Sequence, residues 1–386
     1  MKFSVKISNF GRIGCISDLP KPWSTKIFKT PAFFTYTRGG TVPHLTHNTL
    51  ERIEDHQNLF LLQTLPSTID FKEAVEGQCK GLHNFVGLPE YPFHLSLQDP
   101  GTLTPTGYNV TKGMSVFSEG GRKILTPDQF MNTVKAFKPV SYQALSDSDT
   151  PLKCSKKRLI KSVDNSIRFL DECLEEHRKC KDLEDTAVFA TLQGGYNPFL
   201  RKKSAEETAE RTVDGYVFDG FHVNGPDVEN VDAPKMIEIL LNVFPILPED
   251  KLRILHGAFD PQTMLEAVKC GIDVFDSSYA EKLTESGEAS IYPLEAVSSF
   301  FSKDIIDSVP KRSKFTEKLS LKDGLYKEDF EPILETCNCY TCTHYKRAYI
   351  HHLLVTNELL AEILLMVHNM HHMSLFFKQI QNSISN

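Results

Sequence analysis

The sequence of 386 residues has no long hydrophobic run. Apolar residues make up 40% of it, but nowhere do about 18 of them follow one another, as a membrane-crossing helix requires. The first residues also lack the charged start, apolar stretch and small-residue cleavage site of a secretory leader. Residues 1–17 instead alternate apolar and polar side chains, which predicts two strands joined by a turn. We therefore expect neither a membrane-spanning helix nor a leader.

Regularly spaced cysteines are lacking over most of the chain. The chain has nine cysteines, an odd number. In a chain without a leader, scattered cysteines indicate reduced thiols and a reducing compartment. The scattered ones are Cys15, Cys79, Cys154, Cys173, Cys180 and Cys270.

An excess of positive charge is absent as well. The formal net charge of −7 argues against a protein that coats nucleic acid by bulk electrostatics. Two local basic runs stand out, at residues 153–158 and 201–203. Such runs usually lie on solvated helix faces, and we favour that interpretation for both.

A glycine-rich phosphate loop of the G-x-G-x-x-G kind is missing, which weakens a doubly wound nucleotide-binding fold. From about residue 137, predicted strands recur every ~20–45 residues with helices between them, as in the βαβ units of a parallel sheet. This order predicts an α/β protein whose strands close into a barrel. The expected strands are 139–145, 187–192, 216–221, 252–255 and 272–275, and the expected helices are 156–179, 199–211, 234–243 and 261–269.

Three regions follow from this pattern. Residues 1–100, rich in Thr, Phe, Pro and Gly, predict an N-terminal antiparallel β section that leads into the barrel. Residues 101–300 are expected to form the (β/α) barrel. Residues 301–386 are expected to hold an extended charged connection (301–330), a cysteine cluster and a helix from Tyr345 to about Met370. The apolar stripe of this helix is broad enough to be buried against the barrel or a partner chain, and we expect Leu360 and Leu364 to face a partner.

The last three cysteines form a compact cluster. Cys337, Cys339 and Cys342 stand as C-x-C-x-x-C, close enough for one loop to wrap a single ion. Thiolates and imidazole suit zinc, which takes four such ligands in a tetrahedron; redox thiols and a chance cluster are the alternatives. A site with four protein ligands leaves no position for water and would be structural. The candidate fourth ligands are His344, His351, His352, His368, His371 and His372; His344 lies too close to Cys342 in sequence, and His351 and His352 come early on the helix.

The segments CNCYTC, RAYIHHLL, NELL and HN, within residues 337–369, resemble the zinc subdomain of the tRNA-guanine transglycosylases, the queuine tRNA-ribosyltransferase family. The resemblance extends to residues 193–195 (QGG), 215–220 (GYVFDG) and 271–276 (GIDVFD). It implies a (β/α)8 barrel of the TIM type with an N-terminal antiparallel sheet and a C-terminal zinc-binding subdomain. It also implies one structural Zn²⁺ per chain, held by Cys337, Cys339, Cys342 and His368.

The resemblance further indicates where the family's catalytic groups fall. Asp276 matches the carboxylate that attacks the ribose and displaces guanine, and Gln193 is retained. The base-reading aspartate falls on Ser146, or on Asp147 if the alignment shifts by one residue.

Other catalytic positions differ from the family pattern. The segment that carries the family's acid/base aspartate matches residues 118–123, with Ser118 in place of the aspartate and Glu119 beside it. Asp219 replaces a glycine that approaches the purine, and residues 277–282 replace a Pro-Thr-Arg run whose basic residues hold RNA. One carboxylate is kept and its supporting groups are not, which favours a non-catalytic member.

The family's eukaryotic enzyme combines a catalytic and a non-catalytic accessory subunit, which together replace a tRNA anticodon guanine with queuine. We expect this chain to be the accessory partner of that heterodimer, contacting tRNA through the complex, with a homodimer as the alternative when the partner is absent. Two other hypotheses stay open: an active transglycosylase with Asp276 as nucleophile and Glu119 or Asp147 as acid/base, and a stand-alone zinc-bearing RNA-binding module. The resemblance implies a cytoplasmic protein, peripherally associated with the cytoplasmic side of the mitochondrial outer membrane.

Overall fold

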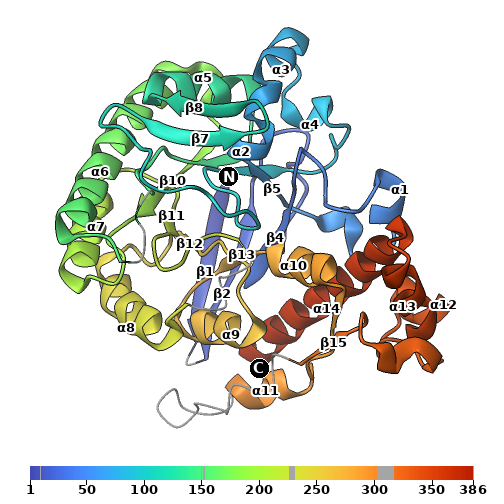
Figure 1. Ribbon diagram of the computed structural model, residues 1–386. Coiled ribbons are helices and arrows are strands. Elements are labelled where there is room, and N and C mark those ends of the chain that lie inside the picture. The colour runs from blue at the N-terminus through green and yellow to red at the C-terminus, as the bar shows by residue number, and fades with distance from the viewer. Residues whose placement is uncertain (9, 149, 151–152, 226–230, 302–316, 386) are drawn as a thin grey trace.

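The computed structural model describes the chain except residues 9, 149, 151–152, 226–230, 302–316 and 386. Its centre is a closed barrel of parallel strands in the order β10-β11-β12-β13-β4-β5-β6-β9 (Figure 1). The predicted (β/α)8 barrel is therefore confirmed. The strands are β4 (Ala32–Tyr36), β5 (Leu61–Thr64), β6 (Phe93–Ser96), β9 (Ser141–Gln143), β10 (Ala187–Leu192), β11 (Gly215–Phe218), β12 (Leu252–Ile254) and β13 (Val274–Asp276).

Helices form a ring around the barrel (Figure 1). Five of them begin at a side chain that accepts a backbone N–H of the first turn, which supplies one of the hydrogen bonds that a helix start lacks. These capping residues are Thr126, Ser155, Asn197, Asp232 and Asp260. The helices are α5 (Pro127–Phe137), α6 (Lys156–Lys179), α7 (Pro198–Ala209), α8 (Ala233–Val243) and α9 (Pro261–Cys270), followed by α10 (Ser278–Ser286).

An antiparallel sheet of β1 (Lys2–Ser8), β2 (Gly11–Ser17) and β3 (Phe28–Thr30) packs against the N-terminal end of the barrel. Arg12 anchors it there, donating to both carboxylate oxygens of Asp273, at 2.9 and 3.1 Å, just before β13. The same guanidinium donates to the carbonyls of Glu249 and Lys251 ahead of β12. A buried pair with this many hydrogen bonds holds the sheet in one orientation on the barrel.

The antiparallel section is shorter than the region predicted at residues 1–100. The strands β4, β5 and β6 precede residue 100 and already belong to the barrel, so the barrel does not begin near residue 101. Residues 33–37 look like part of an antiparallel strand, but β4 pairs in parallel with β5 and β13. A strand of five residues is too short for its hydrophobic pattern to distinguish the two arrangements.

The C-terminal lobe follows the barrel. It contains β14 (Glu288–Ser290), α11 (Ala296–Phe301), β15 (Lys318–Ser320), α12 (Tyr340–His344), α13 (Arg347–Val355) and α14 (Leu359–Ser385). The helix predicted from Tyr345 to about Met370 is thus two helices, of which α14 lies along the barrel against α10 and α11. The connection predicted at 301–330 falls largely outside the described residues; its described part includes β15.

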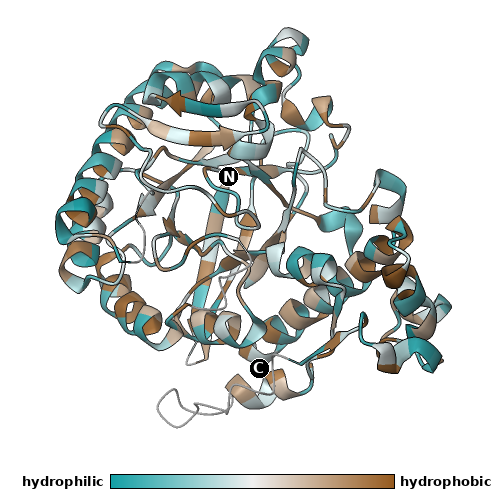
Figure 2. Cartoon of the chain, in the orientation of Figure 1, coloured by the Kyte–Doolittle hydropathy of each residue, from teal (hydrophilic) through white to brown (hydrophobic). Residues whose placement is uncertain are grey.

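The apolar stripe of the C-terminal helices is mostly buried within the chain itself. Figure 2 shows hydrophobic residues concentrated in α13 and the first half of α14. Leu364 is 1% exposed, and Leu360 packs against the cluster around the cysteines. The expectation that these two leucines face a partner is therefore wrong. Within the described ranges, no helix combines the length and hydrophobicity of a membrane span.

Candidate functional site

Three cysteines and one histidine meet at the N-terminal end of α12 and the middle of α14. Nδ1 of His368 lies 3.8 Å from Sγ of Cys337, 3.6 Å from Sγ of Cys339 and 3.3 Å from Sγ of Cys342. All four ligand atoms are within 4.8 Å of one another, and all four residues are buried. The structure therefore brings together the four residues that the resemblance assigned.

Backbone contacts fix the orientation of His368. Its Nε2 lies 2.8 Å from the carbonyl oxygen of Ser290 and is held as the N–H donor, which leaves the Nδ1 lone pair facing the sulfurs. Asn369 next to it accepts a hydrogen bond from the Ser290 N–H and donates to the Glu288 carbonyl. The His-Asn pair thus ties α14 to β14 and presents one imidazole nitrogen to the thiol cluster.

The other candidate histidines are engaged elsewhere. Nδ1 of His351 lies 2.9 Å from the Leu321 carbonyl, Nε2 of His372 lies 2.9 Å from the Tyr292 carbonyl, and His371 faces Glu54 at 3.4 Å. His344 contacts the carbonyl of Tyr340 in its own short helix, and His352 is exposed. Backbone direction along α14 decides between His368 and its neighbours, and cysteine spacing alone carries no such information.

The donor set fits a tetrahedral zinc ion. Zinc bonds of about 2.3 Å to sulfur and about 2.0–2.1 Å to nitrogen place neighbouring S and N ligands about 3.6 Å apart in a tetrahedron. The observed S···N distances of 3.3–3.8 Å span that value. Three thiolates and an imidazole would fill all four positions, so the ion would hold α12 on α14 and would offer no site for water or substrate.

Asp276 is the last residue of β13 and lies at the mouth of the barrel, the edge formed by the C-terminal ends of its strands. Its side chain is fully buried. One oxygen accepts from the N–H of Gly257 at 2.8 Å, and the other accepts from the N–H and hydroxyl of Ser278. Burial opposes ionisation, but the contacts with His256, Ser278 and Gly257 outweigh it and hold the pKa of Asp276 below its usual range. The carboxylate is ionised, with both oxygens already engaged.

Histidines at the mouth were missed by the sequence analysis. His256 follows β12, and its Nδ1 lies 3.4 Å from the Asp276 carboxylate; the rings of His94 and His256 lie 5.8 Å apart. Burial, with a smaller contribution from His256, lowers the pKa of His94 well below its usual value, so His94 is neutral. The available signal was position, because residues that follow a barrel strand lie at the mouth.

Gln193 and Asp219 meet across the mouth. The Gln193 amide donates to the Asp219 carboxylate at 2.9 Å and to the Ser148 hydroxyl at 3.0 Å. The other Asp219 oxygen accepts the N–H of Gly220 at 2.6 Å. The side chain of Asp219 therefore occupies space that a glycine would leave open, and it engages the retained glutamine.

Asp147 faces away from the mouth. Its carboxylate accepts from both terminal nitrogens of Arg158, from Asn165 and from Asn109. Arg158 and Asn165 belong to α6, outside the barrel. The one-residue shift that would make Asp147 a base-reading group is therefore unsupported, and Ser146, whose hydroxyl contacts Ser148 at 2.8 Å, stands at that position.

The match at residues 118–123 is wrong. Ser118 ends β7 (Met114–Ser118), which pairs with β8 (Gly121–Leu125) in a hairpin outside the barrel. Its hydroxyl donates to Asp70, and Glu119 is exposed. Two glycines in succession here make a hairpin turn instead of a catalytic loop. The segment that follows β6 at the mouth is Leu97-Gln98-Asp99.

Side chains and loop contacts fill the mouth. Asn224 donates to the side chain of Gln98, and the N–H of Gly225 donates to the carbonyl of Pro100 at 3.0 Å. These two hydrogen bonds join the loops that follow β6 and β11. The two cavities left there measure about 50 and about 20 Å³, room for a few water molecules. Sites for small molecules usually measure about 300–1,000 Å³, so the described mouth has no space for a purine.

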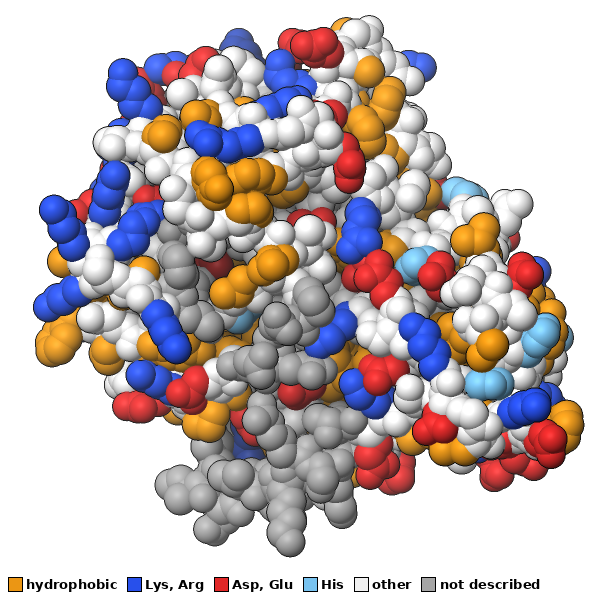
Figure 3. Space-filling view, viewed as in Figure 1, with side chains coloured by type: hydrophobic (Ala, Val, Ile, Leu, Met, Phe, Trp, Pro, Cys, Tyr) orange, Lys and Arg blue, Asp and Glu red, His pale blue; other side chains and the backbone are white. Residues whose placement is uncertain are grey.

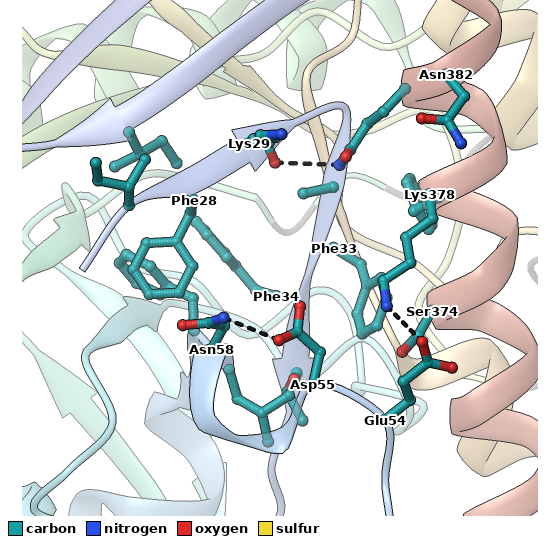
Figure 4. A pocket seen from close by; sticks show the side chains of 18 residues that line it. Phe28, Lys29, Phe33, Phe34, Glu54, Asp55, Asn58, Ser374, Lys378 and Asn382 are labelled. Atoms are coloured by element: carbon teal, nitrogen blue, oxygen red, sulfur yellow. Dashed lines mark hydrogen bonds and ion pairs between the residues drawn. The ribbon is translucent and has the colours of Figure 1, made fainter. Parts of the chain in front are cut away.

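A larger cavity lies elsewhere. It measures about 430 Å³ and opens between the start of β4, the residues before β5 and the second half of α14 (Figure 4). Its polar side chains already pair with one another, Glu54 with Lys378 and Asp55 with Asn58. Phenylalanines line much of the rest, among them Phe28. No catalytic group converges on this cavity among the described residues.

A buried acidic cluster flanks the mouth. Glu281 on α10 is 1% exposed and pairs with Arg38 at 2.7 Å, while Tyr36 donates to Asp99 at 2.6 Å. Burial raises the pKa of Glu281 to about 8, although Arg38 acts in the opposite direction. Glu281 therefore carries its proton in the folded chain over a pH range in which an exposed glutamate has lost it.

This proton predicts a pH dependence of stability. The folded pKa of Glu281 lies above its unfolded value of 4.5, so the free energy of unfolding falls as pH rises through the window between the two. We expect Glu281→Gln to remove a loss of at least about 1 kcal/mol between pH 5 and 8, measured by urea unfolding. Glu172→Gln, at an exposed carboxylate paired with Arg168, should keep the wild-type slope. Equal slopes for wild type and Glu281→Gln would contradict the prediction.

Comparisons with known proteins agree with this architecture. A sequence model described as queuine tRNA-ribosyltransferase matches residues 8–386. A relative from Ixodes scapularis, named queuine tRNA-ribosyltransferase accessory subunit 2, is 41% identical over 99% of this chain and 96% of its own length. Proteins of the same name from Drosophila melanogaster and Xenopus tropicalis are 37% and 36% identical over 100% of this chain, covering 89% and 96% of their own lengths. The chain therefore belongs to the queuine tRNA-ribosyltransferase family.

Proposed function

We propose that this chain is the non-catalytic accessory subunit of a heterodimeric queuine tRNA-ribosyltransferase. In that role it supports the exchange of guanine for queuine at the anticodon wobble position of tRNA. The names of the relatives support this assignment. The observation that carries it is the state of Asp276, which is fully buried and hydrogen-bonded through both oxygens.

The chemistry explains why this state matters. A carboxylate that attacks the ribose needs a free lone pair and a sugar within reach. Attack by Asp276 would first break its bonds to Gly257 or Ser278, in a mouth with cavities of only about 50 and about 20 Å³. Asp219 further reduces the space for a base by projecting toward Gln193.

A second candidate is an active transglycosylase that uses Asp276. It is favoured by the ionised carboxylate at the end of a barrel strand, where catalytic residues of this fold occur. Its acid/base group would have to be Glu119 or Asp147. Glu119 is exposed on a hairpin outside the barrel, and Asp147 is held by Arg158 and Asn165, which argues against this candidate.

A base-exchange assay separates these functions. Guanine-containing tRNA and labelled queuine are incubated with the chain alone, with the catalytic subunit alone and with both. We expect label in tRNA only when both proteins are present at one-to-one stoichiometry. Exchange by the chain alone would establish the active enzyme, and tight tRNA binding without pairing would favour a stand-alone RNA-binding module.

We propose that the metal held by Cys337, Cys339, Cys342 and His368 is zinc and that its role is structural. The donor set and the S···N distances of 3.3–3.8 Å support this identity. When bound, the ion would supply folding free energy to the C-terminal lobe.

We propose that the catalytic subunit docks beside this metal lobe. Val355 at the end of α13 and Leu359 at the start of α14 are 60% and 77% exposed. Exposed aliphatic side chains next to each other are typical of protein interfaces. Leu360 and Leu364, in contrast, pack inside the lobe.

We further propose a cytoplasmic location with peripheral attachment to the mitochondrial outer membrane, on the basis of family membership. Release of the protein from isolated mitochondria by an alkaline carbonate wash would support peripheral attachment. Its retention in the membrane fraction would contradict it.

A further inference from the structure

The first turns of α6 carry an unusual set of charges. Lys153 precedes the helix, and Lys156, Lys157 and Lys161 lie in its first two turns; all four are exposed. No ion pair joins any of them to another described residue. Among the described residues, the basic groups farther along α6 do have acidic partners, such as Arg168 with Glu172 and Lys179 with Glu175.

These lysines oppose the electrostatics of the helix. The N-terminal end of a helix carries a partial positive charge and favours acidic side chains. The first turn of α6, a helix of 24 residues, has none, and Lys156 and Lys157 stand there instead. A local arrangement that costs stability and has no compensating contact points to a functional site.

The lysines lie at the rim of the barrel mouth. α6 follows β9, and Arg158 in its first turn forms two hydrogen bonds with the Asp147 carboxylate just beyond that strand. This bidentate pair fixes the helix start at the rim and leaves the neighbouring lysines free to face outward. Figure 3 shows Lys and Arg side chains standing out along the edge formed by α6 and α7, on the left of the view.

We propose that Lys153, Lys156, Lys157 and Lys161, here called the α6 patch, bind the phosphate backbone of the RNA on which the complex acts. The inference rests on the proposed function. A phosphate near the first turn of α6 would meet the lysines, the helix dipole and the unpaired N–H groups together. In a chain with a net charge of −7, such a local patch would orient RNA instead of binding it over the whole surface.

The surroundings favour RNA over a membrane. A helix that lies on a lipid surface presents a broad apolar face to it. The apolar face of α6, which includes Val163 and Phe169, is buried against the rest of the chain. Ile160, 37% exposed, is the one large apolar side chain of α6 among those prominent on the surface.

Salt-dependent binding tests the proposal. Guanine-containing tRNA is titrated into the assembled heterodimer at several salt concentrations, with wild type and with a variant in which all four patch lysines are changed to Gln. Since each released phosphate contact changes the slope of log K against log salt by about 0.7–0.9, the variant slope should be shallower by about 2–3. Its affinity near 0.15 M salt should fall about tenfold or more, and its melting temperature should stay equal or rise.

The control changes four other lysines to Gln: Lys72, Lys179, Lys318 and Lys378, each paired with a glutamate. It removes the same charge and should keep the wild-type slope. An unchanged slope in the patch variant, or the same loss in the control, would overturn the proposal. So would a patch variant that loses binding to phosphatidylserine vesicles and keeps its affinity for tRNA.

The same measurements keep the two proposals apart. Light scattering first records whether a one-to-one heterodimer forms. If it forms and the slopes are equal, the α6 patch is wrong and the accessory function stands. If no heterodimer forms, the accessory function is wrong, and the titration repeated with the chain alone decides the patch.

Discussion

Cys339→Ser is expected to lose the bound metal and to unfold the C-terminal lobe. The free energy of structural zinc binding is on the order of 10 kcal/mol, and three thiols buried without their ion would remain beside His368. Cys339 also caps α12, accepting the N–H of Cys342. Serine can replace it in that role, so the substitution removes a metal ligand and keeps the cap. Metal content by mass spectrometry and melting temperature are the readouts.

Cys79→Ser is the matched control, because Cys79 is an exposed cysteine far from the metal site in sequence. It should keep one metal ion per chain and the wild-type melting temperature. If Cys339→Ser also keeps both, the four residues do not form a metal site.

The double substitution Val355→Glu and Leu359→Glu is expected to separate the chain from its catalytic partner. Both side chains are exposed, so the change should spare folding and metal binding. Two carboxylates in an apolar interface should cost about 2–4 kcal/mol of binding free energy, which corresponds to a dissociation constant roughly 30- to 1,000-fold higher. The affinity is measured by titration, and stoichiometry by light scattering.

Ile7→Glu serves as its control, since Ile7 is 51% exposed on β1, in the N-terminal sheet. It should leave the heterodimer intact. A Val355→Glu, Leu359→Glu variant that pairs as tightly as wild type would move the interface away from the metal lobe.

The metal ligands could be predicted from sequence because their signal is local and chemical. Three cysteines in one short segment restrict the site to one loop, and the resemblance supplied His368. The choice of His368 over His371 and His372 depends on the direction in which α14 passes β14, as the Ser290 contact shows. That direction is a tertiary property.

Short barrel strands were harder to predict. β10 and α6 appear at their predicted residues, because a six-residue apolar run and a 24-residue amphipathic helix carry strong patterns. The strands β4 and β5 have five and four residues, and their parallel partners lie far away in the chain. Their place in the barrel follows from closure between β4 and β13, which no local pattern contains.

The mouth could be predicted only in part. Asp276, Gln193 and Asp219 lie there because each follows or ends a predicted strand. Asp147 does not, because successive residues of an extended chain point in opposite directions, and its side chain turns to Arg158. Ser118 was misplaced because a Gly-Gly pair fits both a catalytic loop and a hairpin turn.

The catalytic partner, and not this chain, is proposed to perform the chemistry. Asp276→Asn in this chain tests that claim most directly, measured as the rate of queuine incorporation by the assembled heterodimer at saturating tRNA. We expect a rate within about twofold of wild type, because the nucleophile belongs to the catalytic subunit. A rate lower by about a hundredfold or more, with the heterodimer still assembled and folded, would show that Asp276 acts as the nucleophile and would contradict the claim.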